Sequence, residues 1–174
     1  MKVEAPDFLR LAENAGTVLF FDLETQGLTA DYGKILVYSR KFNDDNCRTT
    51  FREQSILKAM REDFEKADLL VGYNSRLFDV TYANTRLLEW GKLPLPKKHH
   101  LDMYFALKGK LRTTSKTMGA VGAFLNLQEA KLRIGPGAWR NRDYETLKKR
   151  CESDVILLEQ VYHKTKHLVV TINT

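Results

Sequence analysis

Two acidic residues, Asp22 and Glu24, lie at the end of the most apolar run of the sequence, TVLFFDL at residues 17–23. A continuous run of β-forming apolar residues predicts a buried central strand. Residues i and i+2 of a strand face the same side, so the two carboxylates would project together and repel each other. A hard divalent cation relieves this repulsion, and oxygen ligands select Mg²⁺ or Mn²⁺. The alternative is an exposed strand end that carries two solvated acids.

Two further acids stand where the predicted elements could bring them to the same place. Asp79 follows a second apolar strand and begins a helix, and Asp154 lies inside a long helix, directly before four apolar residues. An Asp in so apolar a stretch needs a partner, either a neighbouring Lys or a shared cation. Together with Asp22 and Glu24, these acids would suit two-metal catalysis, in which one ion activates a water and the other stabilises the leaving oxygen.

Three segments resemble, in the same order, the motifs of the DEDD exonuclease superfamily. FDLET at residues 21–25 resembles the first motif, FDxET, and VGYNSRLFD at residues 71–79 resembles the second, an apolar strand followed by NxxxFD. CESDV at residues 151–155 resembles the third motif, in which an Asp follows a Tyr or His in a helix. The chain is therefore similar, over most of its length, to the ribonuclease-H-like exonuclease domains related to the proofreading domains of family B DNA polymerases.

This resemblance implies an α/β, RNase H-like fold with a mixed five-stranded sheet flanked by helices. It also implies a 3′–5′ exonuclease that hydrolyses nucleic-acid phosphodiesters with two Mg²⁺ or Mn²⁺ ions. In such enzymes the counterparts of Asp22, Glu24 and Asp154 bind the catalytic metal. The counterpart of Asp22 bridges to the second ion, which the counterpart of Asp79 holds, often through water.

The chain departs from the family pattern at one catalytic position. The family usually places a Tyr four residues before the third-motif Asp, or a His four or five before, and this chain has Arg150 and Lys149 there. Arg stays protonated and is no general base, so Arg150 either stabilises charge on the scissile phosphate or marks a lost base. The histidines offer no replacement at that spacing, and His99 and His100 are expected at the surface or in a hairpin. Two alternatives follow: a catalytically weak module that binds nucleic acid or a partner, and an endonuclease on the same fold.

The positive charge of the chain is concentrated in one segment. The formal net charge is +6, and residues 97–150 hold 13 Lys and Arg against 4 Asp and Glu. Such a local excess is typical of a polyanion-binding face, although a solvated basic surface looks the same in sequence. The candidate nucleic-acid contacts are Asn74, Lys108, Lys110, Arg112, Trp139 and Arg140.

Two of these candidates have a plain structural alternative. Trp139, among arginines in a Gly-Pro-Gly-Ala-Trp loop, has the composition of a stacking platform for a single strand, but it could instead pack on the core. Asn74 could contact a phosphate or cap the following helix. The expected partner is nucleic acid with a free 3′ end, single-stranded and either DNA or RNA. The domain could act alone or in a larger replication, repair or RNA-processing assembly.

The elements that must position these residues follow from hydrophobic periodicity. Besides residues 17–23, we expect strands at residues 33–42, 47–51 and 68–73, and helices at residues 7–13, 54–67, 78–90, 116–125 and 144–167. Residues 43–46 form a hairpin turn, Gly91 closes the helix before it, and Ser115 caps the next helix. Residues 100–107 are expected to run from a strand into a helix, residues 131–141 to form a loop, and residues 169–172 to add a strand or stay loose. This order predicts a mixed sheet, its first three strands antiparallel, with helices on its faces.

The remaining features bound the class of protein. The length of 174 residues suits a single domain over residues 1–174, and a 43% hydrophobic composition can form a core. Residues 1–14 lack the apolar region of a signal peptide, and no apolar run is long enough to span a membrane. Cys47 and Cys151 form no CxxC pair and are expected as reduced thiols. We therefore expect an intracellular, cytoplasmic protein.

Overall fold

The computed structural model describes residues 15–129 and 131–170, so the helix expected at residues 7–13 lies outside the described residues. Five strands form one sheet in the order β3-β2-β1-β4-β5. The central strand is β1 (Val18–Thr25). On one side of it, β2 (Ile35–Phe42) and β3 (Arg48–Phe51) are added in antiparallel order. On the other side, β4 (Leu69–Gly72) and β5 (His99–Asp102) are added in parallel order. The mixed sheet with three antiparallel strands first is the one predicted.

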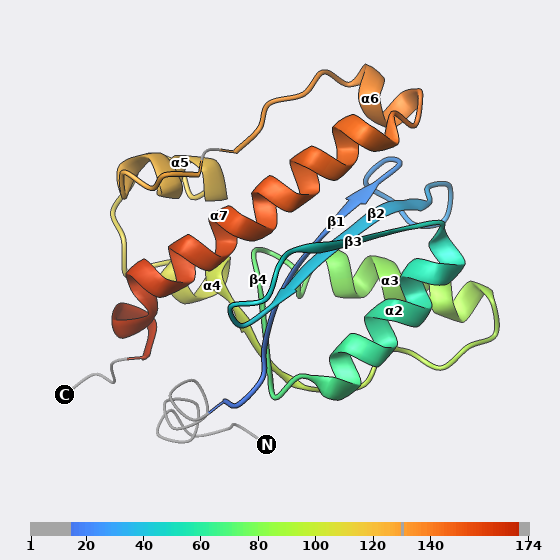
Figure 1. The fold of residues 1–174 in the computed structure, drawn as a ribbon, viewed down its shortest axis with the longest axis horizontal. Coiled ribbons are helices and arrows are strands. Elements are labelled where there is room, and N and C mark those ends of the chain that lie inside the picture. The colour runs from blue at the N-terminus through green and yellow to red at the C-terminus, as the bar shows by residue number, and fades with distance from the viewer. Residues whose placement is uncertain (1–14, 130, 171–174) are drawn as a thin grey trace.

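Helices cover both faces of this sheet (Figure 1). One face carries α2 (Glu53–Lys66) and α3 (Asp79–Glu89), whose apolar side chains share a core with it. The opposite face carries α4 (Met103–Leu107), α5 (Met118–Phe124) and the long α7 (Tyr144–Val170), which form a second core. A short helix, α6 (Gly137–Arg140), lies beside the beginning of α7.

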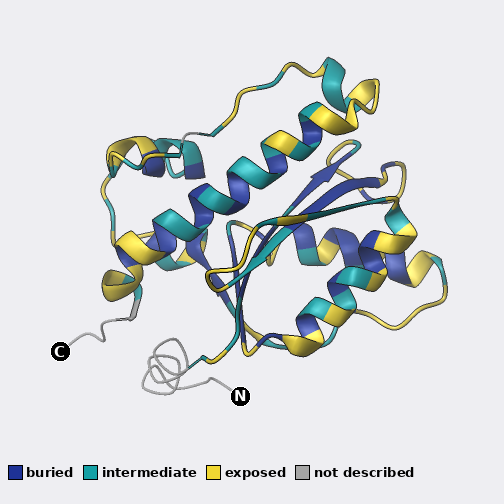
Figure 2. Cartoon of the chain, in the orientation of Figure 1, coloured by how far each residue is buried: buried dark blue, intermediate teal, exposed yellow. Residues whose placement is uncertain are grey.

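The pleat of β1 divides its side chains between these two cores. Leu19, Phe21 and Leu23 pack with α2 and α3, whereas Phe20 packs with α7. Because alternate residues of a strand share a face, Asp22 projects on the α7 side, as Phe20 does. Burial of each of these apolar side chains stabilises the fold by roughly 2 kcal/mol. The strand is dark blue over much of its length in Figure 2, as a central strand should be.

Polar contacts fix the long helix α7 across the antiparallel half of the sheet. Glu152 accepts a hydrogen bond from the Thr49 hydroxyl at 2.6 Å, and Glu159 accepts two from the Lys41 ammonium at 2.6 and 2.7 Å. The thiol of Cys151 donates to the backbone carbonyl of Asp22 at 3.3 Å. These contacts fix the position of α7 along β1. They therefore determine which residues of β1 lie near the acidic side chains of α7.

Two predicted turns are confirmed together with their chemistry. In the β2–β3 hairpin, Asn43 has a positive φ of 40°, and its side chain accepts from Val18 N and donates to Gly16 O. Asn tolerates this left-handed conformation better than most residues. Gly91 closes α3 with φ 64°, and the N–H groups of Gly91 and Lys92 satisfy carbonyls of the last turn.

Three boundaries differ from the sequence prediction. The N-cap of α5 is Thr117, whose side chain accepts from Ala120 N, rather than Ser115. Residues expected as an open loop contain the one-turn helix α6, which hydrophobic periodicity cannot reveal at that length. Helix α7 continues to Val170, so residues 169 and 170 are helical and not a strand, while residues 171–174 lie outside the described residues.

Two exclusions made from the sequence can be compared with the structure. Cys47 and Cys151 are both free thiols, as expected. No helix within the described residues is both long and apolar enough to cross a membrane.

Candidate metal centre

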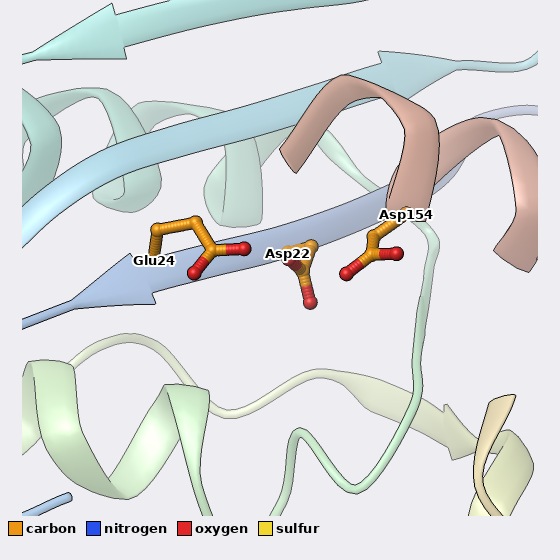
Figure 3. A group of neighbouring side chains, drawn as sticks. All are labelled: Asp22, Glu24 and Asp154. Carbon is orange, nitrogen blue, oxygen red and sulfur yellow. The ribbon is translucent and has the colours of Figure 1, made fainter. Parts of the chain in front are cut away.

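The end of β1 and the middle of α7 bring three carboxylates together. Asp22 and Glu24 come from the α7-facing side of β1, and Asp154 comes from α7. One oxygen from each lies within 4.8 Å of the others. Figure 3 shows the Asp22 side chain between Glu24 and Asp154. The sequence predicted that these three acids would meet, and the structure brings them together.

The electrostatics of this cluster favour the uptake of positive charge. Burial, together with the charges of Asp154, Asp79 and Glu24, raises the pKa of Asp22 well above its usual range. Burial also raises the pKa of Glu24, although Arg150 and a hydrogen bond from Trp139 oppose the shift. A raised carboxyl pKa means that the ionised form is disfavoured until a cation compensates it.

Asp154 supplies a second sign that the cluster fits a metal ion. Its side chain is only 2% exposed, and its Oδ1 atom has no hydrogen-bond partner among the described residues. Buried carboxylate oxygens are normally satisfied, so an oxygen of Asp154 without a partner is consistent with a ligand at this site. Three oxygen donors at this spacing fit a hard divalent cation such as Mg²⁺ or Mn²⁺.

Cationic side chains of the chain itself contact two of the three carboxylates. Lys131 Nζ lies 2.9 Å from Asp154 Oδ2, and Arg150 Nε lies 2.7 Å from Glu24 Oε1. The indole N–H of Trp139 donates to the other Glu24 oxygen at 2.6 Å. The alternative in which Asp154 pairs with a lysine is therefore observed, but the lysine is distant in sequence. Sequence reasoning missed Lys131, for which the only signal was its place in the basic segment.

Arg150 contacts the acid cluster in this structure and does not point into solvent. Its guanidinium contacts Glu24, lies over the Trp139 ring at 5.2 Å from the centroid, and donates to Leu132 O at 2.6 Å. A weaker contact of 3.8 Å reaches Asp154. Its side chain is 15% exposed, so the position where relatives carry a Tyr or His here carries a largely buried cation.

Asp79 is buried near the three acids but is not one of the group. Its Oδ1 atom accepts the backbone N–H of Leu23 at 2.9 Å, which ties the start of α3 to β1. Burial raises the pKa of Asp79 to about 7, and the backbone N–H groups of Asp79 and Leu23 oppose this shift. Its assignment to a second metal stays a prediction.

Asp102 shapes the loop that follows β4. It caps α4 by accepting the N–H of Tyr104, and it also accepts the N–H groups of Asn74 and Arg76 at 2.8 and 2.9 Å. Asn74 has a positive φ of 59°, its side chain is exposed, and α3 begins without a side-chain cap. The structure therefore does not show the capping role considered for Asn74, which remains free to contact a ligand.

A pocket of about 660 Å³ opens beside Asp22. It combines aromatic side chains with lysines, the composition that binds single-stranded nucleic acid. Its lining includes Tyr73, Asn74, Tyr104, Phe105, Lys108, Lys116 and Lys131. The sequence prediction missed these aromatic residues, although Tyr104 and Phe105 directly precede the basic residues at 108–116, and an aromatic residue near positive charges was the signal that singled out Trp139.

The other predicted nucleic-acid contacts do not line this pocket. Lys110, Arg112 and Arg140 are exposed, but they are not among the residues that line it. Trp139 lies instead in a smaller pocket of about 320 Å³, together with Glu24, Leu28 and Phe78. The acid cluster thus stands between two pockets, one reached by Asp22 and the other by Glu24.

One of the two adjacent histidines, His100, is half-buried, whereas His99 is exposed. His100 was expected at the surface, but it lies on β5 against Phe21, and its Nε2 atom is 2.9 Å from the Ser75 hydroxyl. Burial, and to a smaller extent the charge of Arg76, lowers the pKa of His100 to about 4. The expectation failed because β5 has the sheet core on one side, which two adjacent histidines in a sequence do not reveal.

The comparison of this chain with protein families defines its class. The model of the RNase H superfamily matches residues 19–137, more than half of the chain, and the chain therefore belongs to this superfamily. The match includes Asp22, Glu24 and Asp79 but ends before α7, so Asp154 is placed at the site by the structure. The comparison with curated proteins found no match.

A solved structure shows the same fold. The family B DNA polymerase from the hyperthermophilic archaeon Pyrobaculum calidifontis is similar with a TM-score of 0.65 and 16% sequence identity. The similarity covers 90% of this chain and 27% of the polymerase chain, so this chain spans about a quarter of that protein's length. The RNase H-like fold inferred from the three motifs is confirmed.

Proposed function

We propose that this protein is a metal-dependent nuclease of the DEDD type that removes nucleotides from the 3′ end of a nucleic-acid strand. The observation that carries the proposal is the cluster of Asp22, Glu24 and Asp154, which meets within 4.8 Å at the end of the central strand and leaves Asp154 Oδ1 without a partner among the described residues. The three motifs, the superfamily and the fold of the polymerase neighbour support it.

The residues of the site take distinct roles in this proposal. Asp22, Glu24 and Asp154 bind the catalytic ion, and Asp79 contributes to a second ion, as the resemblance implies. When bound, such ions lower the pKa of an attacking water and stabilise charge on the leaving oxygen. Arg150 and Lys131 place two positive charges beside the carboxylates, close to where a phosphodiester would have to lie.

The pocket beside Asp22 supports a single-stranded substrate. Tyr73, Tyr104 and Phe105 offer aromatic faces on which unpaired bases can stack, and Lys108 and Lys116 offer positive charge for the backbone. A base in a duplex already stacks on its neighbours and would have to leave them to use these faces. We therefore propose that the strand enters unpaired.

A second candidate function is a binding module with little or no turnover. The observation that favours it is the pairing of Arg150 with Glu24 and of Lys131 with Asp154, which already compensates part of the charge that a metal would compensate. Such a protein would bind single strands through the same pocket without hydrolysing them.

The experiment that tests the proposal follows 5′-labelled DNA and RNA strands with Mg²⁺, with Mn²⁺ and with chelator. The expected result is a ladder of products shortened from the 3′ end that requires the metal and disappears in Asp154→Asn. Glu145→Gln, an exposed acid in the first turn of the same helix, is the control and should retain the activity. Cleavage of a circular or 3′-blocked strand would instead indicate an endonuclease. Binding without turnover under any metal would favour the binding module.

A further inference from the structure

The acid cluster contains its own counter-ions. Lys131 Nζ is 2.9 Å from Asp154 Oδ2, and Arg150 Nε is 2.7 Å from Glu24 Oε1. Both cations lie outside the three segments that resemble the DEDD motifs. Lys131 reaches the cluster from the segment between α5 and α6. Asp22 has no such contact with a cation among the described residues; its carboxylate instead accepts a long hydrogen bond of 3.6 Å from the Cys151 thiol.

We propose that Lys131 and Arg150 are resident counter-ions that compete with the divalent ion for Glu24 and Asp154, and thereby set how tightly the protein holds its metal. The inference rests on the proposed function only in that the carboxylates must be able to bind a divalent cation. It goes beyond that function because it assigns to this chain a built-in weakening of the metal site, exerted by one residue outside the motifs and one at the position of the missing base.

Charge is the physical reason for the competition. Three ionised carboxylates and two cations leave a formal charge of −1 at the cluster, instead of −3 for the carboxylates alone. A divalent ion bound by the same carboxylates would face two positive charges already in contact with them. Like charges in a poorly solvated site repel strongly, so tight binding requires the two cations to move away.

The contacts of Arg150 tie this movement to the segment that precedes α7. Arg150 donates to Leu132 O and stacks on Trp139, and Trp139 itself donates to Glu24 Oε2 at 2.6 Å. The aliphatic stem of Lys131 lies against Gly119 of α5, where an added Cβ would come within 3.1 Å of it. When the cations leave the carboxylates, the surroundings of the Trp139 ring must change with them.

The test measures metal affinity in four proteins by calorimetry with Mn²⁺ at pH 8, without any substrate. They are the wild type, Lys131→Met, Arg150→Met and the control Lys108→Met. Lys108 lines the same pocket as Asp22 and Lys131 but is exposed, so its removal changes the local charge by the same amount without breaking a contact with the cluster. We expect Mn²⁺ to bind about three- to tenfold more tightly in Lys131→Met and Arg150→Met, a change in the range of partly exposed ion pairs. Lys108→Met should remain within about twofold of the wild type.

Fluorescence of Trp139 gives an independent readout. The chain has two tryptophans, so Trp90→Phe leaves Trp139 as the only one. In that background, Mg²⁺ should change the emission of Trp139 with the same midpoint as its binding. The midpoint should move to lower Mg²⁺ when Lys131→Met is added.

Each outcome has a defined meaning. Unchanged or weaker Mn²⁺ binding in Lys131→Met, with a folded protein by circular dichroism, would overturn the inference and leave the proposed function intact. An equal gain in Lys108→Met would also overturn it, because the effect would then be one of net charge. Absence of metal binding in all four proteins would overturn the proposed function itself. Should Arg150→Met fail to fold, Lys131→Met decides alone.

Discussion

Two buried charge clusters lie on opposite faces of the same sheet, and they differ in how completely their charges are compensated. On the α2–α3 face, Arg86 holds Glu53 with two hydrogen bonds of 2.8 and 2.9 Å and also donates to Ala30 O at 3.1 Å. Glu53 in turn accepts the backbone N–H of Ile35 at 2.9 Å. The contacts to Glu53 raise the pKa of Arg86, and these hydrogen bonds give both side chains polar partners.

The cluster on the α7 face is less completely compensated. We call the Glu53–Arg86 cluster saturated, because its charges are paired, and the cluster of Asp22, Glu24 and Asp154 unsaturated, because its acids outnumber the cations in contact with them. Asp22, Glu24 and Asp154 share two cations, two of the acids have raised pKa values, and one oxygen of Asp154 lacks a partner among the described residues. Removing one member of a fully paired buried cluster leaves an uncompensated charge and costs stability, whereas an excess of like charge already costs stability and is often found at functional sites. The two faces thus differ in how far the acids are paired, and only the acids of the α7 face are the ones proposed to bind a cation.

Breaking the saturated cluster should have the largest effect on stability. Glu53→Gln leaves the guanidinium of Arg86 buried without its bidentate carboxylate, and we expect a loss of about 3 kcal/mol in the free energy of unfolding, measured in urea. Glu62→Gln, an exposed acid of the same helix in a 3.8 Å pair with Lys58, is the control and should cost less than about 0.5 kcal/mol. Equal effects of the two changes would contradict the comparison.

Charge reversal along the basic segment should affect substrate binding. With Lys108, Lys110 and Arg112 changed to Glu, the slope of log affinity against log salt should fall by roughly 0.7 for each phosphate that these side chains no longer bind. Of these three residues only Lys108 lines the pocket beside Asp22, so we expect the single change Lys108→Ala to remove one such phosphate interaction. An unchanged slope in the triple variant would mean that this segment is only a solvated surface.

Removing one acid from the unsaturated cluster should stabilise the metal-free protein. The raised pKa of Asp22 means that its ionised form, which dominates in the unfolded chain above about pH 4, costs stability in the folded protein at neutral pH. Asp22→Asn should therefore increase the free energy of unfolding by on the order of 1 kcal/mol at pH 7 without metal. A loss of the size expected for Glu53→Gln would show instead that this cluster is also saturated.

The smallest expected effect concerns His100 and the pH dependence of stability. Its pKa is about 4 in the folded protein and 6.5 without the surrounding structure, so the unfolded chain binds a proton that the folded one excludes between these values. Stability should fall as the pH drops from 6.5 to 4, and it should fall more steeply in the wild type than in His100→Asn. His163→Asn, on the exposed side of α7, should keep the wild-type slope.

The sequence was informative where chemistry follows from local periodicity. The apolar run before Asp22 predicted a central strand, and the alternation of its residues placed Asp22 and Glu24 on one side. The apolar surroundings of Asp154 predicted that it needs a partner, and the resemblance to the DEDD motifs grouped it with the other two acids. These are properties of a strand and of a helix face, which a sequence carries directly.

The contacts that complete the site depend on tertiary structure. Arg150 meets Glu24 across 126 residues, Trp139 meets the same acid across 115, and Lys131 reaches Asp154 from a segment without regular structure. Hydrophobic periodicity does not predict the conformation of such an irregular segment, because that conformation depends on how α5 and α7 pack. The same limit explains why α6, the Thr117 cap and the aromatic pocket were not predicted.

The most direct test of the central claim is whether Mn²⁺ stabilises the protein through the unsaturated cluster alone. Thermal unfolding of the wild type, Asp22→Asn and Glu53→Gln should be followed with Mn²⁺ and with chelator. A ligand at about 100 times its Kd stabilises the folded state by about 2.7 kcal/mol, so the unfolding midpoint of the wild type should rise clearly with Mn²⁺. Glu53→Gln should start lower and rise by a similar amount, whereas Asp22→Asn should start higher and not respond. A metal response that survives in Asp22→Asn would contradict the account.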